Sequence, residues 1–278
     1  MTNPRTLLEQ YDIDPKKSLG QNFLQDPNTL EKIVASADLM PEDVVVEVGP
    51  GTGALTELLA QSARHVFAIE LDERLRPVLE EQLAPYKNVY LVFDDILKVD
   101  VLQLVGTKPF VVVANVPYYI TSAILKHFLE RHRRPRHLVL TVQLDVAERL
   151  IAKPGDMSLL AVSVQFFGKP RIMSKINPTV FWPRPEVDSA ILRIDTYEHP
   201  EVNVPSVELF FRVVRAGFSQ KRKQLKNALG GGLAIKAALA GELLENAGID
   251  ATRRAETLSL EEWGALAHAY AAHLQQQP

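Results

Sequence analysis

The sequence predicts an α/β fold with a mostly parallel β-sheet, followed by a small all-α domain. In the first two thirds of the 278 residues, short apolar runs rich in β-branched residues alternate with amphipathic stretches, which is typical of βαβ units around a parallel sheet. In the last third only helical patterns remain. With 46% hydrophobic and 23% charged residues, the chain can bury a substantial core, and we expect one large and one small domain.

The predicted strands are apolar through most of their length, so we expect them to be buried on both faces of a central sheet. The stretches between them repeat apolar residues at three-to-four spacing, as helices that cover a sheet do. Five strands are predicted at residues 44–48, 65–70, 89–93, 110–115 and 137–144, and three helices at 54–63, 73–83 and 122–132.

Proline-rich and polar segments mark the end of the first part of the chain. Residues 180–195 contain two prolines and then an apolar alternation, which predicts a loop that feeds a last strand, and residues 196–205 read as a linker. Helices are then predicted at 208–229, 233–247 and 260–274, with the glycines at 230–232 as a break. We therefore predict two domains, residues 1–200 and residues 201–278.

Composition excludes several kinds of site. Because the chain has no cysteine, disulfides, thiolate metal sites and cysteine nucleophiles are ruled out. The seven histidines show no convincing ligand spacing with carboxylates, so no metal site is expected. No apolar run approaches the roughly 18 residues that a membrane span needs, and the polar start does not resemble a signal peptide. We expect a cytoplasmic protein with no membrane partner.

A glycine-rich turn directly after the first strand predicts a ligand site. Glu47 precedes Gly49, Gly51 and Gly53, and a predicted helix follows. Glycines let the backbone turn sharply and approach a ligand, and the helix start supplies unpaired N–H groups. The acid in front of the glycines is able to face an aminoacyl group. The alternative is a tight strand-to-helix turn with a packing role alone.

The ends of the next two strands carry acids with an aliphatic neighbour. The second strand ends in Glu70-Leu71, where a carboxylate can accept hydrogen bonds from both hydroxyls of a ribose. The third is followed by Asp95-Ile96, which can meet an adenine amine and its ring face. S-adenosylmethionine fits this order of groups better than a dinucleotide does. If the glycine turn is purely structural, these acids are solvated loop residues.

A polar residue, a proline and an aromatic follow the fourth strand as Asn115, Pro117 and Tyr118. An adenine amine is a poor nucleophile until acceptors hold its hydrogens, and the Asn115 side-chain carbonyl and Pro117 backbone carbonyl are suited to this. Proline stiffens the turn, and the Tyr118 ring offers a face to an extruded base. Taken alone, this segment is also compatible with a turn whose tyrosines pack the core.

These segments resemble the ribosomal RNA adenine dimethyltransferase family, in particular its small-subunit branch, along nearly the whole chain. The resemblance implies a Rossmann-like class I methyltransferase domain and a helical RNA-binding domain. One departure is the Met157-Ser158-Leu159-Leu160 stretch, where the family usually has a tyrosine and glycine before a helix. The matching motifs, beyond the glycine turn and the Asn115 segment, lie at residues 16–24, 181–189 and 255–263.

The resemblance also assigns roles to residues. Phe181 is implied to face Tyr118 across a flipped adenine, so that two rings sandwich the base. Residues implied to bind the cofactor, together with the glycines and the strand-end pairs above, are Gln21, Asn22, Leu24, Gly49, Glu70, Asp95 and Asn115.

Family members of the small-subunit branch place two methyl groups on each of two adjacent adenosines in the 3′-terminal hairpin of small-subunit ribosomal RNA, late in assembly. The implied partners are this RNA and the immature 30S particle, and a monomer is expected. Two alternatives are an assembly factor whose binding matters more than methylation, and an enzyme that methylates a large-subunit adenine.

The charge distribution contains a basic stretch that the net charge of −3 conceals. Residues 209–241 include no acid, and such a stripe neutralises phosphates and releases counterions when it binds RNA. A second arginine group at 131–136 is a further candidate for phosphate contact, although a solvated face is the simpler interpretation of either group alone. The residues predicted to bind RNA are Arg215, Lys221, Arg222, Lys223 and Lys226.

Overall fold

The computed structural model describes residues 3–115 and 117–276. By its internal contacts the chain divides into two compact units, residues 1–147 with 170–196 and residues 148–169 with 197–278. The sequence places a single boundary at residue 200, whereas the structure groups residues 148–169 with the C-terminal helices. The aromatic core of the second unit explains this, because the ring of Phe166 stacks on that of Phe210 at 4.4 Å between centroids.

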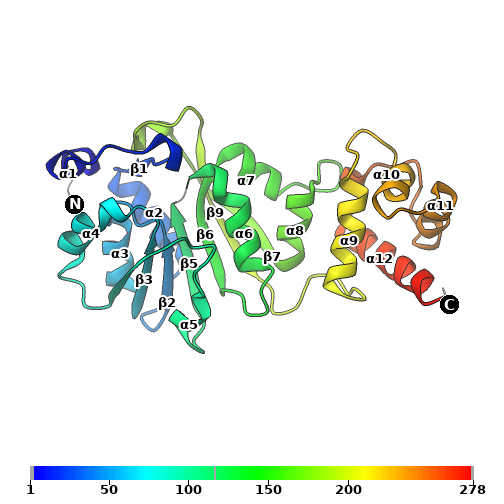
Figure 1. The fold of residues 1–278 in the computed structure, drawn as a ribbon, viewed down its shortest axis with the longest axis horizontal. Coiled ribbons are helices and arrows are strands. Elements are labelled where there is room, and N and C mark those ends of the chain that lie inside the picture. Colours follow the sequence, from blue (N-terminus) through cyan, green and yellow to red (C-terminus); the bar gives the residue numbers. More distant parts are fainter. Residues whose placement is uncertain (1–2, 116, 277–278) are drawn as a thin grey trace. The chain divides into compact units, whose positions relative to one another are not determined.

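The first unit contains a seven-stranded sheet in the order β4-β3-β2-β5-β6-β9-β7 (Figure 1). Neighbours from β4 to β6 run parallel, and β9 pairs antiparallel with β6. The strands are β2 (Val44–Val48), β3 (His65–Glu70), β4 (Val89–Phe93), β5 (Phe110–Asn115), β6 (His137–Gln143), β7 (Gly168–Ile176) and β9 (Ser189–Thr196). The predicted α/β fold is confirmed.

Helices α2 (Pro27–Ala37) and α3 (Ala54–Ser62) pack on one face of this sheet. Their apolar residues share a core with Val45, Val111 and Val139 of three adjacent strands. The other helices of this unit are α4 (Arg76–Leu83), α5 (Val101–Val105) and α6 (Thr121–Leu129), while α7 (Leu144–Leu150) crosses the division between the units. From β2 the sheet continues to β3 and β4 on one side, and from β5 it continues to β6 on the other. Open α/β sheets bind ligands at such a point, beyond the carboxyl ends of the strands.

The N-terminal arm, residues 3–24, consists of α1 (Pro4–Gln10), a single 3₁₀ turn at Lys17–Leu19 and the short strand β1 (Phe23–Leu24). Leu8 and Phe23 join an apolar cluster with Leu75, Leu79 and Leu83. β1 pairs antiparallel with β8 (Phe181–Trp182), which lies far along the chain. Both ends of the arm are therefore fixed to the first unit.

The second unit is helical: α8 (Leu159–Phe167), α9 (Val207–Phe218), α10 (Leu225–Gly232), α11 (Ala237–Asn246) and α12 (Leu260–Gln275). Ser158, part of the departure at 157–160, caps α8 by accepting a hydrogen bond from the Ala161 N–H at 3.2 Å. Ser259 and Glu262 form a capping box at the start of α12, which satisfies two otherwise unpaired backbone donors.

The continuous helix predicted at 208–229 is wrong, because the chain turns at residues 219–224 between α9 and α10. After this turn α10 packs closely against α9: a Cβ on Gly232 would lie 2.5 Å from the Ala216 Cα. The glycines at 230–232 therefore belong to α10 and permit this close crossing, and they do not break a helix as predicted.

Candidate active site

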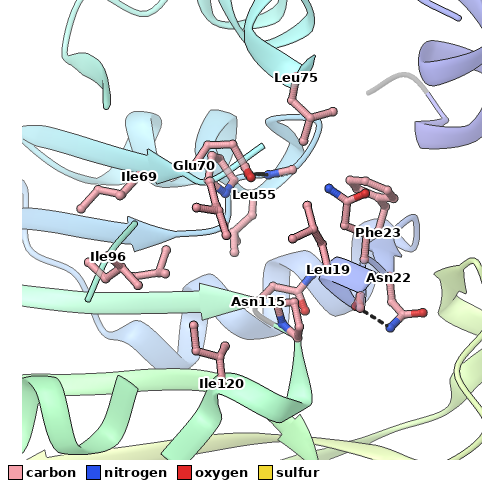
Figure 2. Close-up of a pocket in the computed structure, with 18 of the residues that line it drawn as sticks. Leu19, Asn22, Phe23, Leu55, Ile69, Glu70, Leu75, Ile96, Asn115 and Ile120 are labelled. Atoms are coloured by element: carbon pink, nitrogen blue, oxygen red, sulfur yellow. Dashed lines mark hydrogen bonds between the residues drawn. The ribbon is translucent and has the colours of Figure 1, made fainter. Parts of the chain in front are cut away.

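A pocket opens at the carboxyl ends of β2, β3 and β5, entirely within the first unit, and contains about 1080 Å³ of empty space with its open mouth included. Parallel strands present these ends at one edge of the sheet, so groups distant in sequence meet there. Figure 2 shows Glu70 and Asn115 at the ends of their strands, with Ile69 and Ile96 nearby. The N-terminal arm supplies part of the wall through Leu19, Asn22 and Phe23.

The glycine turn after β2 takes the conformation that the sequence requires. Gly49, Gly51 and Gly53 all have positive φ, at 73°, 59° and 90°, which side chains rarely adopt. At Gly51 a Cβ would also lie 3.0 Å from the Phe23 ring. The turn leads into α3, whose first residues have no side-chain cap, so their N–H groups remain available to a ligand.

Glu70 is held at the end of β3 by two backbone donors. Its Oε1 accepts the Asp72 N–H at 2.8 Å and its Oε2 accepts the Gly51 N–H at 3.2 Å. Burial raises the pKa of Glu70, and these N–H groups oppose the rise because they favour the carboxylate. Each oxygen keeps a lone pair for a further donor, so the group is oriented to accept two hydroxyls.

The other strand-end residues complete an amphipathic wall. Asp95 and Ile96 line the pocket beside Leu71, which is 51% exposed. Asp95 Oδ1 accepts the Leu97 N–H at 3.0 Å, which turns the short chain segment after β4. One carboxylate oriented to accept two donors, a second carboxylate and flanking aliphatic groups fit S-adenosylmethionine, whose adenosine presents hydroxyls, an amine and an apolar ring.

Glu47 and Gly53, both predicted to contact the cofactor, are not among the described residues that line the pocket. Glu47 lies opposite Ala68 of β3 and Val113 of β5, two residues before Glu70 and Asn115, so its side chain shares their face of the sheet but lies deeper along the strands, under α3. A Cβ on Gly53 would meet Leu79 and Leu83 at 3.4 Å, on the side of α4. Direct contact of either residue with the cofactor stays a prediction.

Glu47 is fully buried, and within the described part of the chain neither of its carboxylate oxygens accepts a hydrogen bond. Burial raises the pKa of Glu47 to about 8, against a lowering by the nearby Thr56 hydroxyl and with a further rise from the charge of Glu70. The group therefore holds a proton at neutral pH, which avoids an unpaired buried charge.

The segment after β5 brings Asn115, Pro117 and Tyr118 to the pocket, together with the exposed Tyr119; Val116 lies outside the described residues. The Asn115 side chain makes no hydrogen bond with another described residue, so its amide has capacity for a substrate. The half-buried Tyr118 is tied to β9, because its hydroxyl and the Ser189 hydroxyl lie 2.7 Å apart. Burial raises the pKa of Tyr118, which keeps the phenol neutral.

Phe181 packs in the core with an exposed fraction of 3% and is not among the described pocket-lining residues. Its strand pairs with β1, where it lies opposite Leu24. Leu24 lines the pocket, so Phe181 is one residue removed from it. Its stacking on a base against Tyr118 stays a prediction.

Several lining residues were not predicted, among them Leu19, Phe23, Leu75, Ile120 and Ile124. They are apolar residues of the arm and of helices, and in the sequence they do not differ from core positions. Phe23 and Leu19 lie inside the 16–24 motif that the resemblance identified, which was the available signal.

The two basic groups differ in their partners. The arginines at 131–136 bind the first unit: Arg136 pairs with Asp43 at 2.7 Å, Arg134 donates to the Leu129 carbonyl at 2.9 Å, and Arg133 donates to the carbonyls of Gly106 and Lys108. In contrast, the side chains of the exposed Arg215, Lys221, Arg222 and Lys223 form no ion pair or hydrogen bond with other described residues, and Lys226 follows at the start of α10.

Among residues 3–115 and 117–276, no group of three His, Asp or Glu side chains is arranged to hold a metal ion. Within the same ranges, every helix is too short or too polar to cross a membrane.

The chain is similar to known proteins in both sequence and structure. A family model described as ribosomal RNA adenine dimethylase matches residues 14–266. The ribosomal RNA small subunit methyltransferase A of Dehalococcoides mccartyi (strain CBDB1) is 46% identical over 274 residues, which cover 98% of this chain and 94% of that protein.

Two solved structures are similar over most of the chain. The 23S rRNA methyltransferase ErmE has a TM-score of 0.71 at 29% identity and covers 89% of this chain and 99% of its own. A dimethyladenosine transferase from Plasmodium falciparum has a TM-score of 0.77 and covers 90% and 98%, but at 24% identity it supports the fold alone. The family match and the identity to the Dehalococcoides protein together show that this chain belongs to the ribosomal RNA adenine dimethylase family.

Proposed function

We propose that this protein transfers methyl groups from S-adenosylmethionine to the N6 atoms of two adjacent adenosines in the 3′-terminal hairpin of small-subunit ribosomal RNA. The observation that carries the proposal is that one pocket contains both the oriented Glu70 carboxylate and the uncommitted Asn115 amide, at the ends of the two strands that flank β2. S-adenosylmethionine is the methyl donor and supplies an electrophilic methyl group on a sulfonium.

The cofactor half of the pocket holds the donor. Glu70 accepts the ribose hydroxyls, Asp95 accepts the adenine amine, and Leu71 and Ile96 cover the ring. The glycine turn and the start of α3 approach the amino-acid end with backbone N–H groups. Asn22 and Leu24 of the arm close the wall, since both line the pocket.

The acceptor half activates and places the amine. The Asn115 side-chain carbonyl and the Pro117 carbonyl accept the two N6 hydrogens, which draws the nitrogen lone pair out of conjugation with the ring. Tyr118 stacks on the base, and Phe181 is proposed as the opposite face. Positioning of this kind accounts for much of the rate enhancement when the electrophile is already strong. The methylated amine loses its extra proton to water or a carbonyl, so no strong general base is needed.

The basic residues of the second unit bind RNA phosphates. Arg215, Lys221, Arg222, Lys223 and Lys226 form no ion pair with any residue that the structure describes, so their charge is available to a polyanion. The arginines at 131–136 are weaker candidates, because phosphate contact would compete with their existing partners. Target choice then depends on RNA shape and on the accessible adenines.

The small-subunit target is favoured over a large-subunit one by the higher identity, 46% against 29%, to the relative named for the small subunit. We further propose that the protein acts as a monomer in the cytoplasm on the immature 30S particle. An assembly role that does not need methylation would appear as rescue of assembly by a folded variant that cannot bind the cofactor.

Mass spectrometry of the RNA tests the target. Immature small subunits incubated with protein and methyl donor are expected to gain two adjacent N6,N6-dimethyladenosines in the 3′-terminal hairpin. Methylation of large-subunit RNA only, or at another base, would contradict the proposal.

A further inference from the structure

The N-terminal arm crosses the cofactor pocket between its two fixed ends. α1 is anchored by Leu8 in the apolar cluster and by a hydrogen bond from the Tyr11 hydroxyl to Glu81. β1 is anchored by its pairing with β8. The residues between them include Leu19, Gly20, Gln21 and Asn22, which line the pocket, so the stability of this crossing determines how well the cofactor is enclosed.

Asp72 is the centre of the polar contacts that fasten this crossing segment. Its Oδ2 accepts the Gln21 side-chain N–H at 2.9 Å and an Arg74 guanidinium N–H at 2.6 Å, and its Oδ1 accepts Arg74 Nε at 2.9 Å. Arg74 in turn donates to the Asp14 carbonyl at 3.2 Å. Asp72, which is 4% exposed, thus binds the arm directly at Gln21 and indirectly at Asp14 through Arg74.

Both ends of the Gln21 side-chain amide form a hydrogen bond in this arrangement. Its Nε2 donates to Asp72, and its Oε1 accepts the Lys16 N–H at 2.8 Å. A carboxylate can only accept and a backbone N–H can only donate, so a single amide orientation satisfies both contacts. Gln21 therefore lies in the wall of the pocket as a fastening of the arm, and its second N–H and second lone pair remain for a ligand.

Asp72 also contacts Glu70, the residue proposed to bind the ribose of the cofactor. The Asp72 backbone N–H donates to Glu70 Oε1 at 2.8 Å while its side chain holds the arm. Hydrogen bonds from Arg74 and Gln21 outweigh burial and lower the pKa of Asp72, so the carboxylate is charged and its bonds are charge-assisted. These bonds are stronger than neutral ones, and the pair with Arg74 is largely shielded at the Asp72 end, where the side chain is 2% exposed.

We propose that Asp72 is a positioning residue that, through Gln21 and Arg74, holds residues 14–22 across the pocket and thereby sets how long S-adenosylmethionine stays bound. Release of the cofactor then requires the enclosing segment to move aside, and the fastening opposes this movement while the cofactor is bound. Loss of the fastening should therefore speed dissociation more than it changes association. The proposal rests on the pocket holding the methyl donor and not on which RNA is modified.

Stopped-flow binding of S-adenosylmethionine to the full-length protein tests this directly. Gln21→Ala removes the arm's contact, and Asp72→Asn weakens both fastenings at similar volume. Because a hydrogen bond to a charged group is lost, dissociation should accelerate roughly tenfold or more in each variant. The association rate should change by much less, and the double variant should add little to the larger single effect, as expected for residues that act through one contact.

Glu73→Ala is the matched control. Glu73 follows Asp72 in sequence, but its ion pair with Arg76 is exposed, and Glu73 does not line the pocket. Its dissociation rate should match the wild type. An unchanged dissociation rate in Gln21→Ala, with that variant folded, would overturn the proposal. The proposal would also be overturned if the two single variants lost association rate equally and the double variant lost the sum, because this would indicate general damage to the pocket. Failure of the pocket to bind the donor at all would appear in the wild type and would contradict the cofactor assignment instead.

Discussion

The two halves of the pocket differ in how many of their polar side chains already form hydrogen bonds within the protein. In the cofactor half, Glu70 already accepts two backbone donors, and three positive-φ glycines fix the turn beside it. In the acceptor half, the Asn115 amide has no partner among the described residues, and Tyr118 is held by a single hydroxyl contact to Ser189. The comparison teaches that the donor site is built in advance, whereas the acceptor site is completed by the substrate.

The largest effect is expected at the preformed half. Glu70→Ala removes the acceptor of both ribose hydroxyls, so the dissociation constant for S-adenosylmethionine should rise roughly 100-fold, as the loss of two charge-assisted hydrogen bonds implies. Isothermal titration calorimetry measures this. Near-normal affinity in a folded Glu70→Ala protein would break the comparison, because the donor site would not depend on its best-oriented group.

Tyr118 sharpens the contrast on the acceptor side. Tyr118→Ala removes a stacking face worth about 1–3 kcal/mol for a base, so kcat/KM for the RNA should fall roughly tenfold or more while the affinity for the donor stays close to normal. Tyr118→Phe and Ser189→Ala both keep the ring and remove only the hydroxyl contact. These two variants should show the same, smaller loss in kcat/KM. A larger loss in either one than in Tyr118→Ala would exclude stacking as the role of the ring.

The third prediction concerns stability and depends on Glu47. Its pKa is about 8 in the folded protein against 4.5 as the usual value. As pH rises from 4.5 to 8, the unfolded chain loses this proton while the folded chain keeps it, so this group's share of stability is lost across that window. The loss amounts to a few kcal/mol at most.

Glu47→Gln stays neutral in both states, so its melting temperature relative to the wild type should rise between pH 5 and pH 8. The exposed Glu73→Gln is the control and should leave the pH dependence unchanged. A constant difference between Glu47→Gln and the wild type across this range would mean that Glu47 is not protonated in the folded protein.

The sequence predicts the preformed half better than the open half, for physical reasons. The strands from Val44, His65, Val89 and Phe110 begin and end at the predicted residues, because parallel strands are nearly continuous apolar runs. Burial on both faces was wrong for the strand from Val89, which lies at the edge of the sheet and is only partly buried. The pocket residues at their ends follow from the same topology. Glu47 shows the limit: it is close to the turn in sequence, but it pairs with Ala68 and Val113, two residues before the strand-end Glu70 and Asn115, and is fully buried there.

The second unit was harder to predict because helical periodicity does not report where a helix turns. The apolar spacing continues from α9 into α10, although residues 219–224 form a turn and Gly232 crosses close to Ala216. Helices α7 and α8 and strand β7 were also not predicted. Phe181 is a related case, since an aromatic identified by its motif lies in the core with 3% exposure, and its burial depends on the long-range pairing of β8 with β1.

The central claim is that Asn115 activates the acceptor while the neighbouring strand ends hold the donor. The most direct test measures the single-turnover rate of methyl transfer by Asn115→Ala at saturating S-adenosylmethionine, together with its dissociation constant for the donor. The account predicts a rate lower by roughly 100-fold or more, as for the loss of one preorganised polar group, and a dissociation constant that changes far less than in Glu70→Ala. An unchanged rate of methyl transfer would contradict it.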